Sequence, residues 1–399
     1  MRKSPERRFY IEKGSLFLYR GRKEMNRKIL VVGIILLFIG TAIIPSSGQN
    51  IEKTSSSISK GNILYVGGSG PGNYTKIQDA IDNARDGDTV FVYAGIYYEN
   101  ITIYHVITVL GENKDTTIID GYETDNVVYI VGNGICFSGF TVQNSSLFGG
   151  AGIMVLADGG SVEITNVHVT DNAIGILLKS GTGTILHDTV INNNTETGVF
   201  VQSYRSEILD NTITNNRFFG IVLLDEDVDY TIIKNNVITY SREGIWISDM
   251  YQTSNIEITN NIIMNSSTYG VSLGAVDSEI NGNQFCNNSI AVTLAGAQRN
   301  DIRDNTFRNN NQGLLIVGGG KNRIHRNNFI QNQEDAFFTH LLFAQNARNH
   351  WYRNYWDSHR LPIPKPIKGQ KVLFIPFSIW FNISWVQFDL LPALKPYGQ

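Results

Sequence analysis

Apolar and polar positions recur along most of this chain in a unit of about 22 residues. Residues 207–224, EILDNTITNNRFFGIVLL, show the unit: Ile-x-x-Asn-x-Ile-x-x-Asn, followed by an apolar run that begins with Gly. The first Asn position recurs at Asp188, Asn211, Asn236, Asn261, Asn283, Asn305, Asn327 and Asn349, with weaker matches at Val167 and Phe140. The Gly-led run recurs at Gly152, Gly175, Gly198, Gly220, Gly244, Gly270 and Gly313.

Short alternating runs at this period, without heptads and with almost no Pro, are typical of a right-handed parallel β-helix. Leucine-rich repeats share the period, but they need a Leu-dominated consensus and a helix in each repeat, which this chain lacks. We therefore predict an all-β, single-stranded solenoid of about ten coils that stack about 4.8 Å apart. The inward ladder should be Val190, Ile213, Ile238, Ile263, Phe285, Phe307, Phe329 and Trp351.

The asparagines of the unit have a structural explanation. The second Asn position lies where the chain turns between sheets, and Asn tolerates the left-handed backbone conformation there. Its amide can also hydrogen-bond the equivalent Asn in the coils above and below. These positions are Asn193, Asn216, Ser241, Ser266, Asn288, Asn310, Asn332 and Asn354.

The two ends of the solenoid depart from the repeat. Thr75 and Gln78 have capping-box spacing, and Ile77, Ala80 and Ile81 follow at helical spacing, which predicts a short α-helix that covers the first coil. The C-terminal tail, residues 361–399, is rich in Pro and aromatic residues. We predict that it packs on the β-helix and covers an outward apolar stripe, although a sugar-stacking platform is the alternative for that stripe. The stripe consists of Met154, Leu177, Phe200, Val222 and Trp246.

The N-terminal residues divide into three segments. Residues 1–24 are basic and patternless, which suggests that translation starts at Met25. Residues 25–48 have the layout of a signal peptide, because the apolar run of 29–44 is shorter than the ~18 to 20 residues of a spanning helix; a retained membrane anchor is the alternative. Residues 49–61 are a linker, and the β-helix with its cap occupies 62–360. We therefore predict an extracellular or cell-surface protein that touches the membrane only through its N-terminal segment.

Charge and cysteine content exclude two classes of interpretation. Residues 1–48 carry ten Lys and Arg against three Asp and Glu, which leaves 23 against 33 in the remainder. Such an acidic remainder argues against a nucleic-acid partner. Cys136 and Cys286 lie six coils apart, roughly 29 Å along the axis, whereas a disulfide needs Cα atoms within ~7 Å. We expect both to remain unpaired.

The chain resembles a known group of β-helix proteins. Its segment YVGGSGPGNYTKIQDAIDNARDGDTVFVYAGIYYENI is similar to the entry segment of pectin-lyase-like β-helices, and its coils and the tail motif NYWDSHRLP resemble NosD-like surface proteins of archaeal type. The resemblance implies the fold, but superfamily members variously cleave, bind or display carbohydrate. NosD itself assists copper-site assembly, which implies a metal-delivery accessory as one alternative. His168 and His187, on adjacent coils, are the only histidines spaced to form a copper-binding pair.

The longest coils carry the candidate chemistry, because extra residues leave a solenoid as loops. Acidic residues gather there: Asp225, Glu226, Asp227, Asp229 and Asp249. They could hold Ca²⁺ for an acidic sugar with Arg205 as a base, act as an acid and base pair, or form a solvated loop. Substrate-binding candidates are Lys179, Tyr204, Tyr230, Trp246 and Tyr251.

These patterns favour an exported β-helix that binds a polysaccharide or cell-surface glycan, or that has a structural or display role at the cell surface. The alternatives are a polysaccharide lyase or glycoside hydrolase that acts on acidic sugars, and the copper-site accessory. Ca²⁺ is the cofactor that the acidic cluster suggests.

Overall fold

The computed structural model describes residues 61–399 except 158–159, 226, 343–347, 376–378 and 399. The segments predicted at 1–24 and 25–48, and residues 49–60 of the linker, lie outside the described residues. Within the described part, no helix is long and apolar enough to cross a membrane. Residues 58–399 form one compact unit that holds the whole described core, so a chain that begins at residue 58 should fold on its own.

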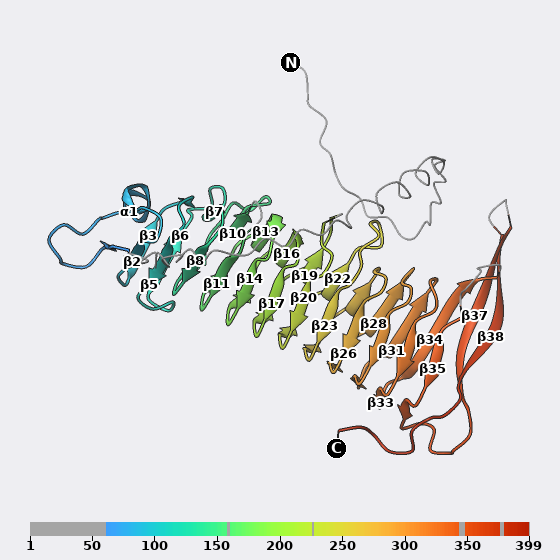
Figure 1. Cartoon of the computed structure of the whole chain (residues 1–399). Helices are drawn as coiled ribbons and strands as arrows, with labels where there is room; N and C mark the ends of the chain where they lie inside the picture. Colours follow the sequence, from blue (N-terminus) through green and yellow to red (C-terminus); the bar gives the residue numbers. More distant parts are fainter. Residues whose placement is uncertain (1–60, 158–159, 226, 343–347, 376–378, 399) are drawn as a thin grey trace, which may run out of the picture. The chain divides into compact units, whose positions relative to one another are not determined.

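The described chain is a parallel β-helix with three faces (Figure 1). The first face contains β1 (Ile63–Val66), β2 (Thr89–Val92), β5 (Thr108–Gly111), β8 (Ile135–Ser138), β11 (Val162–Thr165), β14 (Ile185–His187), β17 (Glu207–Leu209), β20 (Ile232–Lys234), β23 (Glu257–Thr259), β26 (Glu279–Asn281), β29 (Asp301–Arg303), β32 (Arg323–His325) and β35 (His350–Tyr352). The second face contains β3 (Gly95–Tyr98), β6 (Thr117–Asp120), β9 (Thr141–Gln143), β12 (His168–Thr170), β15 (Val190–Asn192), β18 (Thr212–Thr214), β21 (Val237–Thr239), β24 (Ile262–Met264), β27 (Gln284–Cys286), β30 (Thr306–Arg308), β33 (Asn328–Ile330) and β36 (Tyr355–Trp356). The third face contains β4 (Ile101–Ile103), β7 (Val128–Val131), β10 (Ala151–Leu156), β13 (Ile174–Thr182), β16 (Thr197–Tyr204), β19 (Phe219–Leu223), β22 (Glu243–Ile247), β25 (Tyr269–Leu273), β28 (Ile290–Ala295), β31 (Gln312–Val317) and β34 (Glu334–Leu341), and ends in the hairpin β37 (Lys365–Ile375) and β38 (Ile379–Asp389).

The predicted fold class is confirmed, with about 12 coils rather than ten. The additional coils lie at the N-terminal end, where β3 and β6 lack the Asn-containing unit. The predicted inward ladder is correct from Ile213 to Phe329. Phe285 stacks on Phe307 with ring centroids 5.2 Å apart, and Phe307 stacks on Phe329 at 4.7 Å.

Both ends of that ladder were predicted wrongly. The residue that pairs with Ile213 is Ile191, so Val190 points outward beside Thr212. Below Phe329 the ladder continues to Trp356, because the coil between Asn327 and Asn354 has five more residues than its neighbours. Trp351 instead pairs with Ile324 on the first face.

The asparagines form amide ladders, as predicted, but the turn and the ladder use consecutive residues. Asn215 and Asn193 have the left-handed backbone conformation, whereas Asn216 and Asn194, which follow them, carry the ladder. The first ladder is Asn211, Asn236, Asn261, Asn283, Asn305, Asn327 and Asn354. Asn349, predicted for this ladder, belongs to another one with Asn300 and Asn322, and Asn354 replaces it.

The recurring glycines make these ladders possible. A Cβ atom on Gly198 would lie 2.6 Å from the carbonyl oxygen of Gly220 and 2.7 Å from the amide nitrogen of Asn216. Real Cβ atoms do not approach other atoms so closely, so any larger residue would push the ladder Asn or the next coil aside. The Gly-led run therefore leaves room for the amide of the ladder.

The N-terminal helix α1 (Ile77–Asn83) forms as predicted and buries Ile77 and Ala80, but the predicted capping box is absent. Its N-terminal cap is Lys76, which makes no side-chain capping bond. The carboxylate of Glu99 instead accepts hydrogen bonds from the backbone N–H groups of Ile77 and Gln78, at 2.9 and 3.1 Å. A carboxylate at this end of the helix also opposes the positive end of the helix dipole.

The C-terminal tail does not cover the apolar stripe, and that prediction was wrong. The tail forms the hairpin β37–β38, which pairs with β34 at the last coil (Figure 1). The stripe itself has the predicted register from Met154 to Trp246. Its neighbours on the same face bury it in part, and Trp246 stacks on Phe219 at 5.5 Å. The tail could not reach it because strand pairing at the open edge of β34 holds the tail at the end of the solenoid.

Candidate functional site

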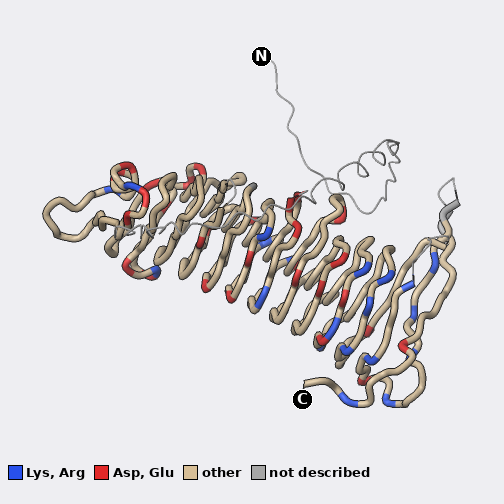
Figure 2. Tube along the Cα trace, in the orientation of Figure 1, with Lys and Arg blue, Asp and Glu red and all other residues tan. Residues whose placement is uncertain are grey.

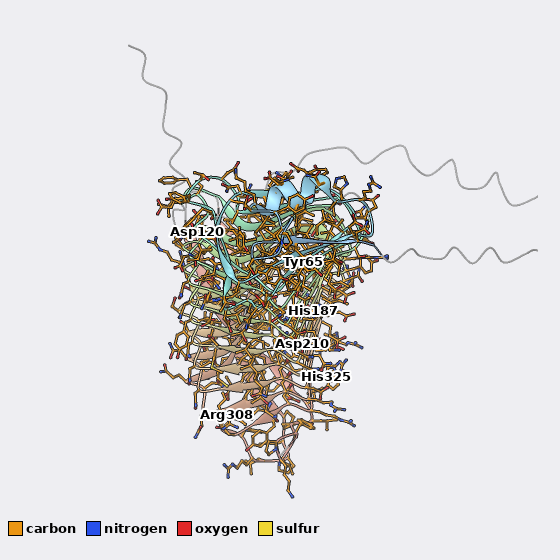
Figure 3. The ribbon with its side chains drawn as sticks, turned by 90° about the vertical axis from the view of Figure 1, so that its left-hand side faces the viewer. Tyr65, Asp120, His187, Asp210, Arg308 and His325 are labelled. Carbon is orange, nitrogen blue, oxygen red and sulfur yellow. The ribbon has the colours of Figure 1, made fainter. Side chains whose placement is uncertain are left out.

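Stacked coils place equivalent outward residues of the first face in columns. One column lies four residues before each Asn of the first ladder and contains Glu207, Ile232, Glu257, Glu279, Asp301 and Arg323. Each of these residues is the direct register partner of the next. In Figure 3, His187, Asp210 and His325 mark this face along the solenoid, while Asp120 and Arg308 mark the second face. The acidic members of the column form a row that is interrupted once, at Ile232.

Two adjoining hollows form a groove over this row, across β17, β20, β23 and β26. Their volumes are about 400 and 480 Å³, and they share Glu207, Ile232, Glu257 and Glu279. The first hollow is also lined by Arg205, Tyr230, Asn255 and Asp277, and the second by Asp210 and Lys234. We call these two hollows together the first-face groove. The groove is open to solvent and crosses four neighbouring strands. Its length therefore suits a ligand that extends over several coils.

An aromatic and cationic cluster forms the wall of the groove near β17. The rings of Tyr204 and Tyr230 meet edge to face, with centroids 5.5 Å apart. The guanidinium of Arg205 lies over both rings, at 5.0 Å from the Tyr204 centroid and 5.5 Å from that of Tyr230. Such cation–π contacts hold the Arg side chain in place, and Tyr230 remains about half exposed (45%) beside it.

Arginines from the next coils neutralise part of the acidic row. Arg299 donates two hydrogen bonds to Asp277, at 2.7 and 2.6 Å, and Arg303 pairs with Glu279. The hydrogen bonds from Arg299 hold the pKa of Asp277 below its usual value. Asp277 therefore stays ionised at neutral pH and is unsuited to act as a proton donor.

The predicted acidic cluster lies on turns that lead from the third face to the first. Asp225 and Asp227 precede β20, and Asp249 precedes β23, whereas Glu226 lies outside the described residues. Asp229 accepts hydrogen bonds from the backbone N–H of Ser254 at 2.6 Å and from its hydroxyl at 3.2 Å. Within the described ranges, no three His, Cys, Asp or Glu side chains are arranged to hold a metal ion.

Calcium binding at this cluster stays a prediction that a thermal scan can check. Ligand at a hundred times its dissociation constant stabilises a protein by about 2.7 kcal/mol, which raises the melting temperature visibly. We expect such a rise at millimolar calcium, and its loss in the Asp225→Asn, Asp227→Asn double variant. If calorimetry of the parent shows neither heat of binding nor a thermal shift, the acidic turn is ordinary solvated surface.

Three other predicted binding residues lie away from the groove lining. Trp246 stacks in the apolar stripe of the third face, and Lys179 is exposed on β13 of that face. Tyr251 lies half-buried on the turn before β23. Of the predicted binding residues and candidate base, the structure therefore brings together Tyr204, Arg205 and Tyr230.

Comparisons with known proteins agree with this architecture. Residues 99–250 match the family described as a right handed beta helix region, and residues 247–360 match the family described as periplasmic copper-binding protein (NosD). The chain is therefore similar to NosD-like and other right-handed parallel β-helix proteins over these two regions. The predicted resemblance to NosD-like and pectin-lyase-like β-helices is thereby confirmed, while the archaeal type stays a prediction.

Solved structures similar to this β-helix share the fold at low sequence identity. The A-module of mannuronan C-5 epimerase AlgE6 from Azotobacter vinelandii has a TM-score of 0.61 and 16% identity, covering 70% of this chain and 87% of that module. The AlgE4 A-module from the same organism has a TM-score of 0.60 and 19% identity, covering 70% and 89%. The Dettilon tailspike protein has a TM-score of 0.56 and 15% identity, covering 79% of this chain and 74% of the tailspike chain. A search of curated protein sequences found no match.

The histidines that were candidates for copper are not a pair in this β-helix. His168 lies on the second face, where its Nε2 is 3.0 Å from the side-chain oxygen of Asn192. His187 lies on the first face between Glu163 and Asp188, at 2.9 and 2.8 Å. Burial lowers the pKa of His187, but hydrogen bonds to these two carboxylates outweigh it and raise the pKa above its usual value. The two histidines therefore do not form the copper-binding pair that was one alternative, because His168 lies on β12 and His187 on β14, which belong to different faces.

Sequence reasoning missed the residues that line the groove floor, Glu207, Glu257 and Glu279. Their signal was present, since each lies four residues before an Asn of the first ladder. The candidate residues were predicted mainly from the long turns, because extra residues in a coil are easy to recognise in the sequence. On a regular solenoid, a constant offset from a ladder residue identifies residues that stack, whether or not a loop is present.

Proposed function

We propose that this NosD-like β-helix is an exported protein that binds a glycan in the first-face groove. The observation that carries the proposal is the open groove across four strands, with Tyr230 and Arg205 as its wall and Glu207 and Glu257 on its floor. Carboxylates accept hydrogen bonds from sugar hydroxyls, and an exposed aromatic ring packs against the apolar face of a sugar ring. The matching family is described as periplasmic, which supports export.

Charge favours an uncharged glycan over a polyanion. Residues 62–298, which contain the groove, carry eight Lys and Arg against 26 Asp and Glu, and acidic positions recur along these coils in Figure 2. A uronate chain laid over Glu207 and Glu257 would meet like charge unless a cation lay between them. We therefore infer that an acidic sugar would need calcium, while a neutral glycan would not.

Removing the exposed Tyr230 ring should weaken glycan binding about tenfold, or about 1.4 kcal/mol, because the ring supplies the stacking surface. Calorimetric titration of Tyr230→Ala with the glycan that the parent retains measures this loss. Tyr240→Ala is a matched control, since Tyr240 is also exposed (61%) and has a similar left-handed backbone, but lies between the second and third faces. If both variants bind the glycan with equal affinity, the first-face groove is not the binding site.

Catalysis is the second candidate, as a lyase or glycoside hydrolase acting on acidic sugars. It is favoured by the placement of Arg205, the candidate base, in the groove wall beside carboxylates. Asp277 is unsuited to be the acid of such a hydrolase, because hydrogen bonds from Arg299 hold its pKa below the usual value. Scoring each retained glycan for cleavage as well as binding distinguishes the two.

A further inference from the structure

The C-terminal hairpin presents apolar side chains on both faces of its last strand. Phe381, Ile383 and Trp385 lie on one face of β38, Val386 and Phe388 lie on the other, and each is between 42% and 51% exposed. Leu390, Leu391 and Leu394 continue the exposed apolar surface, at 53% to 65%. We call these eight residues the hairpin surface. Exposed apolar patches of this kind mark sites of interaction on soluble proteins.

The exposed charge on the tail is positive. Its charged side chains, from residue 361 to 398, are Lys365, Lys368, Lys371, Lys395 and Asp389. Asp389 is fully buried, where its carboxylate accepts hydrogen bonds from Asn354 and Trp356. The ammonium of Lys371 lies 3.7 Å from the ring centroid of Trp385, so cation and aromatic ring are presented together.

The whole C-terminal end is basic, unlike the rest of the described chain. Residues 299–399 carry 13 Lys and Arg against six Asp and Glu, and Figure 2 shows the basic residues gathered toward this end. A partner complementary to this end must therefore be apolar where it meets the hairpin surface and anionic around it.

We propose that the hairpin surface docks on an anionic lipid membrane, with aromatic residues in the headgroup region and lysines on acidic headgroups. Aromatic rings and lysines are the side chains that favour this interface, because the rings suit the headgroup region and an anionic leaflet attracts basic residues near its surface. This contact is independent of the N-terminal segment and of the first-face groove.

The strand pairing of β38 limits how deeply the hairpin can insert into a membrane. In the described residues, β38 pairs with β37 along its length, and with β35 only at Asp389. The other edge of β38 therefore keeps unpaired backbone groups, which hydrocarbon does not tolerate. Docking at the interface, where headgroups and water satisfy that edge, is consistent with this geometry.

A second copy of the chain fits the surface less well. A two-fold contact places the same surface against itself, and here that would bring lysines together without exposed carboxylates to pair with them. Antiparallel pairing of two β38 edges would also leave the side chains on both faces of the strand exposed. We make self-association an outcome of the test.

Vesicle flotation of a chain that begins at residue 58 tests the proposal, because that chain lacks the apolar segment 29–44. We expect flotation with vesicles of phosphatidylcholine and phosphatidylglycerol, much weaker flotation with phosphatidylcholine alone, and a loss at high salt. Trp385→Ser with Phe388→Ser should lower the bound fraction at least tenfold. Phe148→Ser with Met250→Ser removes apolar side chains that are more exposed (94% and 75%) but lie outside the tail, and should change nothing.

A second variant keeps the test decisive if the first unfolds. Lys368→Gln with Lys395→Gln leaves every apolar side chain in place and should reduce the preference for anionic vesicles. Parent protein that fails to float, or flotation that neither variant alters, would overturn the proposal. Light scattering that shows a dimer, dissociated by the Trp385 and Phe388 changes without any flotation of the parent, would assign the surface to a second copy instead.

Discussion

Replacing Phe307 by Asp is expected to lower the free energy of unfolding by at least about 4 kcal/mol. The ring is fully buried and stacks between Phe285 and Phe329 in the inward ladder, at 5.2 and 4.7 Å. A carboxylate in its place is buried among aromatic rings without a partner, and the cavity adds to that cost. Denaturant unfolding measures the loss.

The neighbouring residue provides the control. Thr306 lies on the same strand and points outward, so Thr306→Asp should change stability by no more than about 1 kcal/mol. If both variants unfold at the same denaturant concentration, the inward register of β30 is wrong.

Removing one amide from the first ladder should cost about 3 kcal/mol. The Asn283 amide nitrogen donates to the carbonyl oxygen of Ile258 at 2.7 Å and to the side-chain oxygen of Asn305 at 3.0 Å. Its own side-chain oxygen accepts from the backbone N–H of Asn261 at 2.8 Å. Asn283→Ala leaves these buried donors and acceptors without partners. Each then costs its desolvation free energy in addition to the lost hydrogen bond.

Asn281→Ala is the matched comparison, because Asn281 lies on the outer side of β26 two residues earlier. Urea unfolding of both variants should separate them by about 2 kcal/mol or more. Similar stabilities would mean that the amides contribute little and that apolar stacking alone holds the coils in register.

Most of the fold could be predicted from the sequence because every coil of a solenoid repeats the same strands and the same packing. Phe285, Phe307 and Phe329 are correctly placed from their spacing alone, since each coil between them has 22 residues. The prediction failed where the spacing changed. A longer last coil shifted Trp356 into the place expected for Trp351, and no local pattern announces such an insertion.

The same limit explains the asparagines and the tail. Two consecutive asparagines, such as Asn215 and Asn216, look equivalent in sequence, yet one adopts the left-handed conformation and the other joins the ladder. The position of the tail depends on the open edge of β34, a long-range pairing that the repeat does not encode. Apolar composition placed the tail over the apolar stripe, whereas it pairs with β34 at the last coil.

The candidate site was predicted only in part for a related reason. Tyr230 stood out because it lies on a long turn, and Arg205 because it occupies the matching place one coil earlier; the structure places both in the groove wall. Glu207 and Glu257 are separated by 50 residues and share a face only through the intervening coil. Such a site exists only once the register of the coils is known, so it is a property of stacking and not of any motif.

A glycan screen of the chain that begins at residue 58 tests glycan binding by the groove most directly. Neutral and uronate polysaccharides are presented with and without millimolar calcium, and each is scored for retention and for cleavage. We predict that neutral glycans are retained without calcium and without cleavage, and that Tyr230→Ala loses them while Tyr240→Ala does not. Retention of no glycan, or retention that Tyr230→Ala leaves unchanged, would contradict glycan binding by the first-face groove.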